Sequence, residues 1–143
     1  MLTSGLALNL GGDIAVKRFT LTNNDCTAVA TTQTIALFTL GKESIVTGVR
    51  IKGRTAFAGT AITAVTASVG STSLGAAGLA AAFDILQAVA AGTFQLSQCF
   101  KQGPDAAEAV NVYLTSVGGN LSAMTAGKVD IDVYVLSQTT PAP

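Results

Sequence analysis

Stretches in which apolar side chains occupy every second position dominate the sequence. From residue 128 to 135, valine or isoleucine alternates with lysine, aspartate and tyrosine. The same two-residue period recurs in 45–52 and 110–115. Because successive side chains of a β-strand point to opposite faces, this period predicts strands with one buried face. A chain built from such segments is expected to form β-sheets.

Further strands are predicted at 61–69 and 34–40, with weaker candidates at 16–22, 93–97 and 27–31. Turn signals punctuate these runs at Asn23-Asn24-Asp25, Gly41-Lys42-Glu43, Gly53, Gly70-Ser71, Gly103-Pro104-Asp105 and Gly118-Gly119-Asn120. Short strands at near-regular spacing with glycine-rich turns predict an all-β fold. We expect a two-sheet antiparallel β-sandwich, jelly-roll-like, with about eight strands. The order of the strands within the sheets does not follow from this spacing.

One apolar segment, residues 79–91, fits either a strand or a short helix. Its apolar residues can be placed at strand or at helical spacing, and its alanines favour a helix. We expect a loop from Gly70 to Gly78 followed by a strand near 82–89, with a short helix as the alternative. Residues 104–109 can form one helical turn.

Charged residues are scarce. Eight Lys+Arg balance eight Asp+Glu in 143 residues, so charged residues make up 11 %, against about 25 % in ordinary soluble proteins. The chain has no histidine and no overall basic excess, which argues against catalytic triads, the usual zinc sites and nucleic-acid binding. The most apolar stretch is too short to span a bilayer. We therefore expect no enzyme activity, cofactor, metal site, nucleic-acid partner or membrane partner.

The surface must be covered largely by hydroxyls and small side chains, because 19 threonines, 9 serines and 24 alanines stand beside so few charges. A small neutral domain explains this composition, and so does a subunit whose surface is largely covered by partners. No secretory signal is visible, so we expect folding in a cytoplasm. Cys26 and Cys99 are then expected as buried free thiols, with a disulfide as the alternative.

The two ends differ from the middle of the chain. Residues 1–14 are expected to form an N-terminal arm or a first strand, with leucines spaced by small or polar residues at Leu2, Leu6, Leu8 and Leu10. Residues 15–137 are expected to form the β-sandwich domain. The last six residues, 138–143, contain two prolines and are expected to be a flexible tail.

Two rows of charge fall on predicted strands. Asp130 and Asp132 share one face of the last strand, and a basic row on an earlier strand is formed by Arg50, Lys52 and Arg54. We expect some of these charges to pair across strands or between subunits. A calcium site or a catalytic carboxylate pair would also place two aspartates together, but a solvated or salt-bridged strand face is the simpler interpretation. Tyr134, on the polar face of the last strand, is a further candidate contact residue.

Two segments resemble small virion proteins of tailed bacteriophages. They are IVTGVRIKGRTAFAGT at 45–60, continuing to Ser71, and GNLSAMTAGKVDIDV at 119–133, with Leu96-Ser97 between them. Together with the linking residues, the resemblance covers about residues 35–136. It implies a β-sandwich structural component of the kind that decorates or cements a capsid. The resemblance carries no functional residues, so the arm at 1–14 comes from the leucine pattern alone.

The resemblance implies a mechanical function. We expect a non-enzymatic protein on the capsid surface, assembled in the host cytoplasm, which bridges major capsid protein subunits as a homo-oligomer. A trimer suits a threefold position in the shell, and many modest contacts add up when bridging is multivalent. A tail, collar or fibre-base protein of the virion is the alternative, and a carbohydrate-binding β-sandwich is a more distant one. The candidate partner-contact residues are Leu2, Leu6, Leu8, Leu10, Arg50, Lys52, Arg54, Asp130, Asp132 and Tyr134.

Overall fold

The computed structural model describes residues 14–86, 94–97, 101–102 and 106–137, and over these residues it contains nine strands. The strands are β1 (Ile14–Thr22), β2 (Thr32–Leu40), β3 (Ile45–Gly59), β4 (Ala64–Ser71), β5 (Gly75–Asp84), β6 (Phe94–Ser97), β7 (Lys101–Gln102), β8 (Glu108–Val117) and β9 (Met124–Leu136). Two short 3-10 helices, η1 (Asn23–Asp25) and η2 (Leu121–Ala123), complete the described elements.

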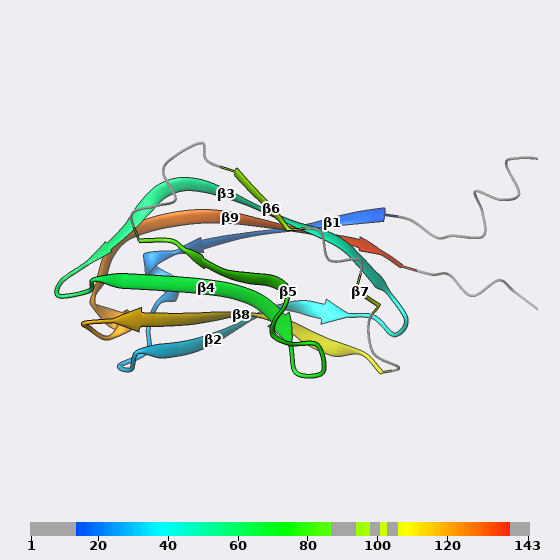
Figure 1. Cartoon of the computed structure of the whole chain (residues 1–143), viewed down its shortest axis with the longest axis horizontal. Coiled ribbons are helices and arrows are strands. Elements are labelled where there is room, and N and C mark those ends of the chain that lie inside the picture. The colour runs from blue at the N-terminus through cyan, green and yellow to red at the C-terminus, as the bar shows by residue number, and fades with distance from the viewer. Residues whose placement is uncertain (1–13, 87–93, 98–100, 103–105, 138–143) are drawn as a thin grey trace, which may run out of the picture.

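The strands form two antiparallel sheets that face each other (Figure 1). One sheet has the order β1-β9-β3-β6, with β7 also paired to β3, and the other has the order β2-β8-β4-β5. The chain crosses repeatedly from one sheet to the other. If β6 and β7 are taken as two pieces of one strand along β3, the two sheets have the eight-stranded jelly-roll order. The predicted all-β, jelly-roll-like sandwich is therefore confirmed.

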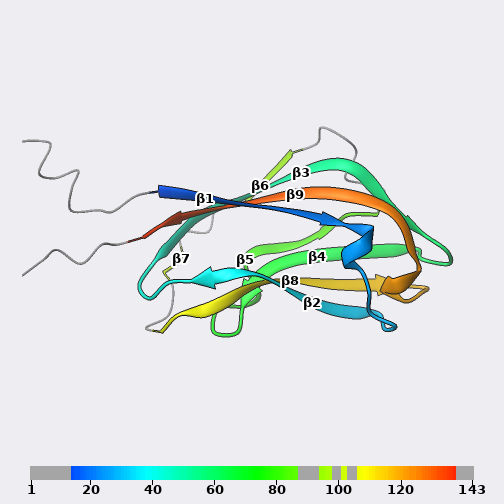
Figure 2. The ribbon, with the colours of Figure 1, turned by 180° about the vertical axis from the view of Figure 1, so that it is seen from behind.

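The alternating apolar residues fill the space between the sheets. In β9, Val129, Ile131, Val133 and Val135 are all buried, as are Val110, Val112 and Leu114 of β8. Seen from behind, β9 runs between β1 and β3 for most of its length (Figure 2). The predicted strands at 128–135, 45–52 and 110–115 lie within β9, β3 and β8, because burying one face of each strand removes its apolar side chains from water.

The predicted turn at Gly53 is wrong, because β3 continues through it to Gly59. Gly53 pairs with Val129, and the register of β3 against β9 shifts between Gly53 and Thr55 and twice more before the strand ends. Such irregularities bend a strand without ending it. Gly53 therefore lies next to one of these irregularities, and residues 54–59 extend the same ladder.

The expected loop from Gly70 to Gly78 is also wrong in its bounds. β4 extends to Ser71 and β5 already begins at Gly75, which has a φ of +90°. A Cβ atom at Gly70 would collide with the backbone of Gly75 and Ala76, so this glycine allows two strands to approach closely. The apolar segment 79–91 belongs to strand β5 as far as Asp84, so the alternative of a short helix does not apply to this part. Residues 87–91 lie outside the described part of the chain.

The weak strand candidate at 27–31 is wrong. The carbonyls of Ala28 and Ala30 accept hydrogen bonds from Ser122 and Leu121 of η2, and Gln33 Oε1 accepts the backbone N–H groups of Thr27 and Ala28. The backbone groups of this segment therefore form their hydrogen bonds with η2 and with the Gln33 side chain, and not with a neighbouring strand. Of residues 104–109, the described part forms no helical turn, because β8 begins at Glu108.

Candidate interaction surface on the β1-β9-β3 sheet

The outer face of one sheet gathers charged side chains from three neighbouring strands. Asp132 of β9 lies between Arg18 of β1 and Arg50 of β3 in the strand register. Two residues along, Asp130 lies between Thr20 and Lys52. Because cross-strand neighbours project from the same face of a sheet, these residues form two adjacent rows across β1, β9 and β3.

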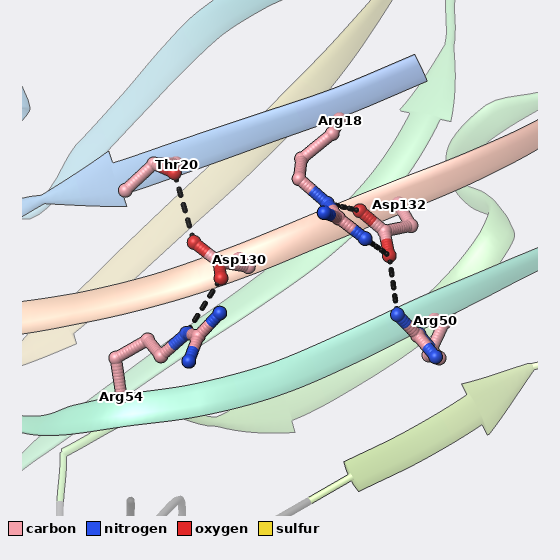
Figure 3. Close-up of polar contacts among 6 residues, drawn as sticks. All are labelled: Arg18, Thr20, Arg50, Arg54, Asp130 and Asp132. Carbon is pink, nitrogen blue, oxygen red and sulfur yellow. Dashed lines mark hydrogen bonds and ion pairs between the residues drawn. The ribbon is translucent and has the colours of Figure 1, made fainter. Parts of the chain in front are cut away.

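Asp132 of β9 contacts side chains of both neighbouring strands, the edge strand β1 on one side and β3 on the other (Figure 3). Arg18 donates from Nε to Oδ1 of Asp132 over 2.7 Å and from Nη2 to Oδ2 over 3.0 Å. Arg50 donates from Nη2 to the same Oδ2 over 2.9 Å. Both carboxylate oxygens are therefore engaged, and the pair with Arg18 has the two-point geometry that suits a guanidinium and a carboxylate.

Asp130 makes the second set of contacts. The Thr20 hydroxyl donates to its Oδ1 over 2.8 Å, and Nε of Arg54 donates to its Oδ2 over 2.6 Å. Figure 3 shows Arg54 reaching this carboxylate from β3, on the side of Asp130 opposite Thr20. With both oxygens of each aspartate occupied by protein donors, the two carboxylates are unsuited to holding a calcium ion between them.

The aspartates are covered while the arginines remain exposed. The Asp132 and Asp130 side chains are 4 % and 10 % exposed, whereas those of Arg18, Arg50 and Arg54 are 59 %, 36 % and 44 % exposed. The hydrogen bond from Arg18 is the main cause that holds the pKa of Asp132 below its usual value. For Asp130, burial acts to raise the pKa, but the bonds from Arg54 and Thr20 outweigh it and the pKa is lowered. Both groups are therefore stabilised as carboxylates.

Two lysines add to the positive charge of this face. Lys52 is in register with Asp130, and Lys128, two residues before Asp130 on β9, also acts to lower the pKa of that aspartate. The face thus carries five of the eight lysines and arginines of the chain, and its two carboxylates lie beneath arginines. The other described carboxylates lie in η1, the β2–β3 turn, β5 and β8, at Asp25, Glu43, Asp84 and Glu108.

An apolar patch borders the charged rows. Ile14 and Val16 of β1 are exposed, and in the register they lie beside Leu136 and Tyr134. Tyr134 and Leu136 are half-buried. By the alternation of the strand, these residues share the face that carries Arg18. The outer face therefore combines an apolar end with a charged middle.

The structure brings together five of the predicted contact residues: Arg50, Lys52, Arg54, Asp130 and Asp132. Tyr134 lies on the same strand and face, while Leu2, Leu6, Leu8 and Leu10 lie outside the described residues. The expected charge pairs form across strands within one chain. Sequence reasoning missed Arg18 and Thr20, since only the pairing of β1 with β9 reveals their role.

Other parts of the described chain offer little for chemistry. No three His, Cys, Asp or Glu side chains gather there to hold a metal ion. Cys26 is a buried free thiol, and burial raises its pKa to about 11, whereas Cys99 lies outside the described residues. A hollow of about 170 Å³ between β1 and β2 has Asp25 as its one ionisable lining residue. The helices of the described residues, η1 and η2, are three residues long each, and neither is a candidate membrane span.

Solved structures of bacteriophage capsids contain chains with a similar fold. A chain in the capsid of Ralstonia phage GP4 is 20 % identical with a TM-score of 0.56, covering 91 % of this chain and 88 % of that one. A chain in the capsid of Helicobacter pylori bacteriophage KHP30 is 14 % identical with a TM-score of 0.56, covering 90 % and 91 %. A chain in the cyanophage Pam1 capsid asymmetric unit is 14 % identical with a TM-score of 0.52, covering 88 % and 86 %. No protein-family model and no curated protein sequence matches the chain.

Proposed function

We propose that this chain is a non-enzymatic structural protein of a tailed-phage virion, which decorates or cements the capsid. The observation that carries the proposal is the shared jelly roll: three capsid structures contain chains that match this one over at least 88 % of its length. The resemblance of 35–136 to small virion proteins supports the same class of function, because it comes from the residues and not from the fold.

The proposed mechanism is mechanical bridging. Each copy contacts adjacent subunits of the major capsid protein, and a homotrimer places three such contacts around a threefold position of the shell. Individual contacts can be modest because several of them act together. The leucine-bearing segment 1–14 is proposed as an anchoring arm, and the face formed by β1, β9 and β3 as a second contact surface. Hydroxyl-rich and sparsely charged surfaces suit a subunit that packs against neighbours.

The experiment that tests the proposal is co-sedimentation with capsid shells. Shells are assembled from the major capsid protein of the phage that encodes this chain, and the purified protein is added in increasing amounts. Saturable binding with a fixed number of copies per shell supports decoration, and a mass of three chains in solution supports the trimer. Absence of binding to shells, together with binding to purified tails, would overturn the capsid assignment in favour of a tail or collar protein.

A further inference from the structure

We propose that the outer face of the β1-β9-β3 sheet binds a carboxylate-rich patch on a neighbouring major capsid protein subunit, an inference that rests on the proposed function. The face is here defined by the side chains of Arg18, Arg50, Lys52, Arg54, Lys128, Asp130 and Asp132, and is called the arginine face. Figure 3 shows the contacts among its arginines and aspartates.

The arginine face presents positive charge although the whole chain is neutral. Five cationic and two anionic side chains give the face a net charge of +3, whereas the formal charge of the chain is zero. The two aspartates are almost fully covered, and the three arginines are between 36 % and 59 % exposed. A partner approaching this face therefore meets guanidinium groups before it meets carboxylates, and complementary charge on the partner is favoured.

The guanidinium groups are already held in place. Asp132 fixes Arg18 through two hydrogen bonds, and Asp130 fixes Arg54 through its Nε. The other N–H donors of Arg18 and Arg54 have no hydrogen-bond partner among the described residues. A guanidinium has five N–H donors arranged for two-point binding of carboxylates. Because the side chains are fixed before the partner arrives, less rotamer entropy is lost on binding.

The surroundings of the arginine face favour a protein over a nucleic acid. Exposed Ile14 and Val16 lie on the same side of β1 as Arg18, and apolar side chains beside arginines are typical of protein–protein contacts. Separate carboxylates on a folded partner can each bind a guanidinium at two points, as Asp132 binds Arg18 within the chain.

The test compares two double variants that change the total charge equally. Lys52→Glu with Lys128→Glu reverses two charges of the arginine face without replacing any arginine or aspartate of the ion pairs. Lys17→Glu with Lys42→Glu is the control. Lys17 is exposed and directly precedes Arg18 in β1, so its side chain projects from the opposite face of that strand, and Lys42 is exposed in the β2–β3 turn. Melting temperatures show whether each variant is folded, and each is then titrated against the capsid shells and against a short DNA duplex.

We expect the Lys52/Lys128 variant to bind shells about tenfold or more weakly than the wild type, because like charges then face each other. The control should bind within about twofold of the wild type, and added salt should weaken the wild type most. Equal binding by both variants, while the wild type still binds, would overturn this inference and leave the proposed function intact. If the wild type binds DNA tightly and the Lys52/Lys128 variant does not, the assignment of a protein partner to this face is overturned. Absence of wild-type binding to shells would overturn the proposed function and this inference together.

Discussion

Arg18 of β1 and Asp132 of β9 lie 114 residues apart in the sequence and form a two-point ion pair, with Nε 2.7 Å from Oδ1. The pair ties the edge strand β1 to β9, the neighbouring strand that also pairs with β3. Arg50 donates to Oδ2 of the same carboxylate, which also accepts from Nη2 of Arg18. One covered aspartate therefore connects three strands and fixes the positions of two arginines on the outer face.

Replacing Asp132 by asparagine should destabilise the fold. The variant keeps the shape of the side chain but removes the negative charge that accepts three hydrogen bonds from two arginines. Loss of charged hydrogen bonds at a covered site predicts a decrease of about 1.5–3 kcal/mol in the free energy of unfolding. Glu43→Gln, in the exposed β2–β3 turn, is the control and should change it by less than about 0.5 kcal/mol. Equal effects in urea denaturation would contradict the role of Asp132.

The same carboxylates should make stability depend on pH in the acid range. The pKa values of Asp130 and Asp132 are lowered in the folded protein, while the pKa of an unfolded aspartate is about 3.9. Their contribution is therefore fully present above the unfolded pKa and is lost as the pH falls through the folded pKa.

Urea denaturation of the wild type and of the Asp130→Asn, Asp132→Asn double variant between neutral pH and about pH 2 measures this effect. The gap in unfolding free energy between the two proteins should narrow below about pH 4. Glu108, whose pKa is also lowered by hydrogen bonds from Ser71 and Ser73, remains in both proteins and accounts for residual acid sensitivity in the variant. A gap that stays constant with pH would contradict the prediction.

Gly127→Ala should be more damaging than an ordinary glycine substitution. Gly127 has a φ of +142°, and a Cβ atom there would collide with the ring of Phe57 in the core. Backbone strain and overpacking together predict a loss of about 2–4 kcal/mol. Gly75→Ala is the matched control, since Gly75 has a φ of +90° but nothing lies within 4 Å of its Cβ position. Equal losses in the two variants would mean that the contact with Phe57 contributes nothing.

Deleting residues 1–12 should abolish binding to capsid shells while the sandwich stays folded. The proposed arm contains Leu2, Leu6, Leu8 and Leu10, and the described core is built from residues between Leu21 and Val135. Removal of 138–143 is the matched control at the other end of the chain and should leave binding unchanged. Thermal unfolding and co-sedimentation of both truncated proteins measure the two properties separately. Retained shell binding after the N-terminal deletion would exclude the arm as the anchor.

The positions of the strands could be predicted from the sequence, but which strands pair with each other could not. The alternation at 128–135 reveals a half-buried strand, because a one-residue shift would place all four apolar side chains in water. Nothing local indicates that this strand lies between residues 14–22 and 45–59, since the pairing is long-range. The sequence predicts a turn at Gly53 because a glycine inside a strand is unusual, and only the continued pairing of β3 with β9 shows that the strand runs through it.

The candidate surface was predictable only in part. The two-residue spacing predicted that Asp130 and Asp132 share one strand face and that Arg50 and Arg54 share another. In the structure, Arg50 of β3 pairs with Asp132 of β9, and Arg54 pairs with Asp130. Arg18 stands in a weak strand candidate with no matching charge nearby in sequence, so its contribution could not be seen before the sheet order was known. The excess of positive charge on one face of a neutral chain is likewise a property of the fold, not of the composition.

The decisive measurement for the proposed function is cryo-electron microscopy of virions of the phage that is proposed to carry this chain. We expect jelly-roll density of this size on the outside of the shell, with the arginine face turned toward acidic side chains of the major capsid protein. Density for the chain at the tail or collar, or its absence from the particle, would exclude the proposed capsid role.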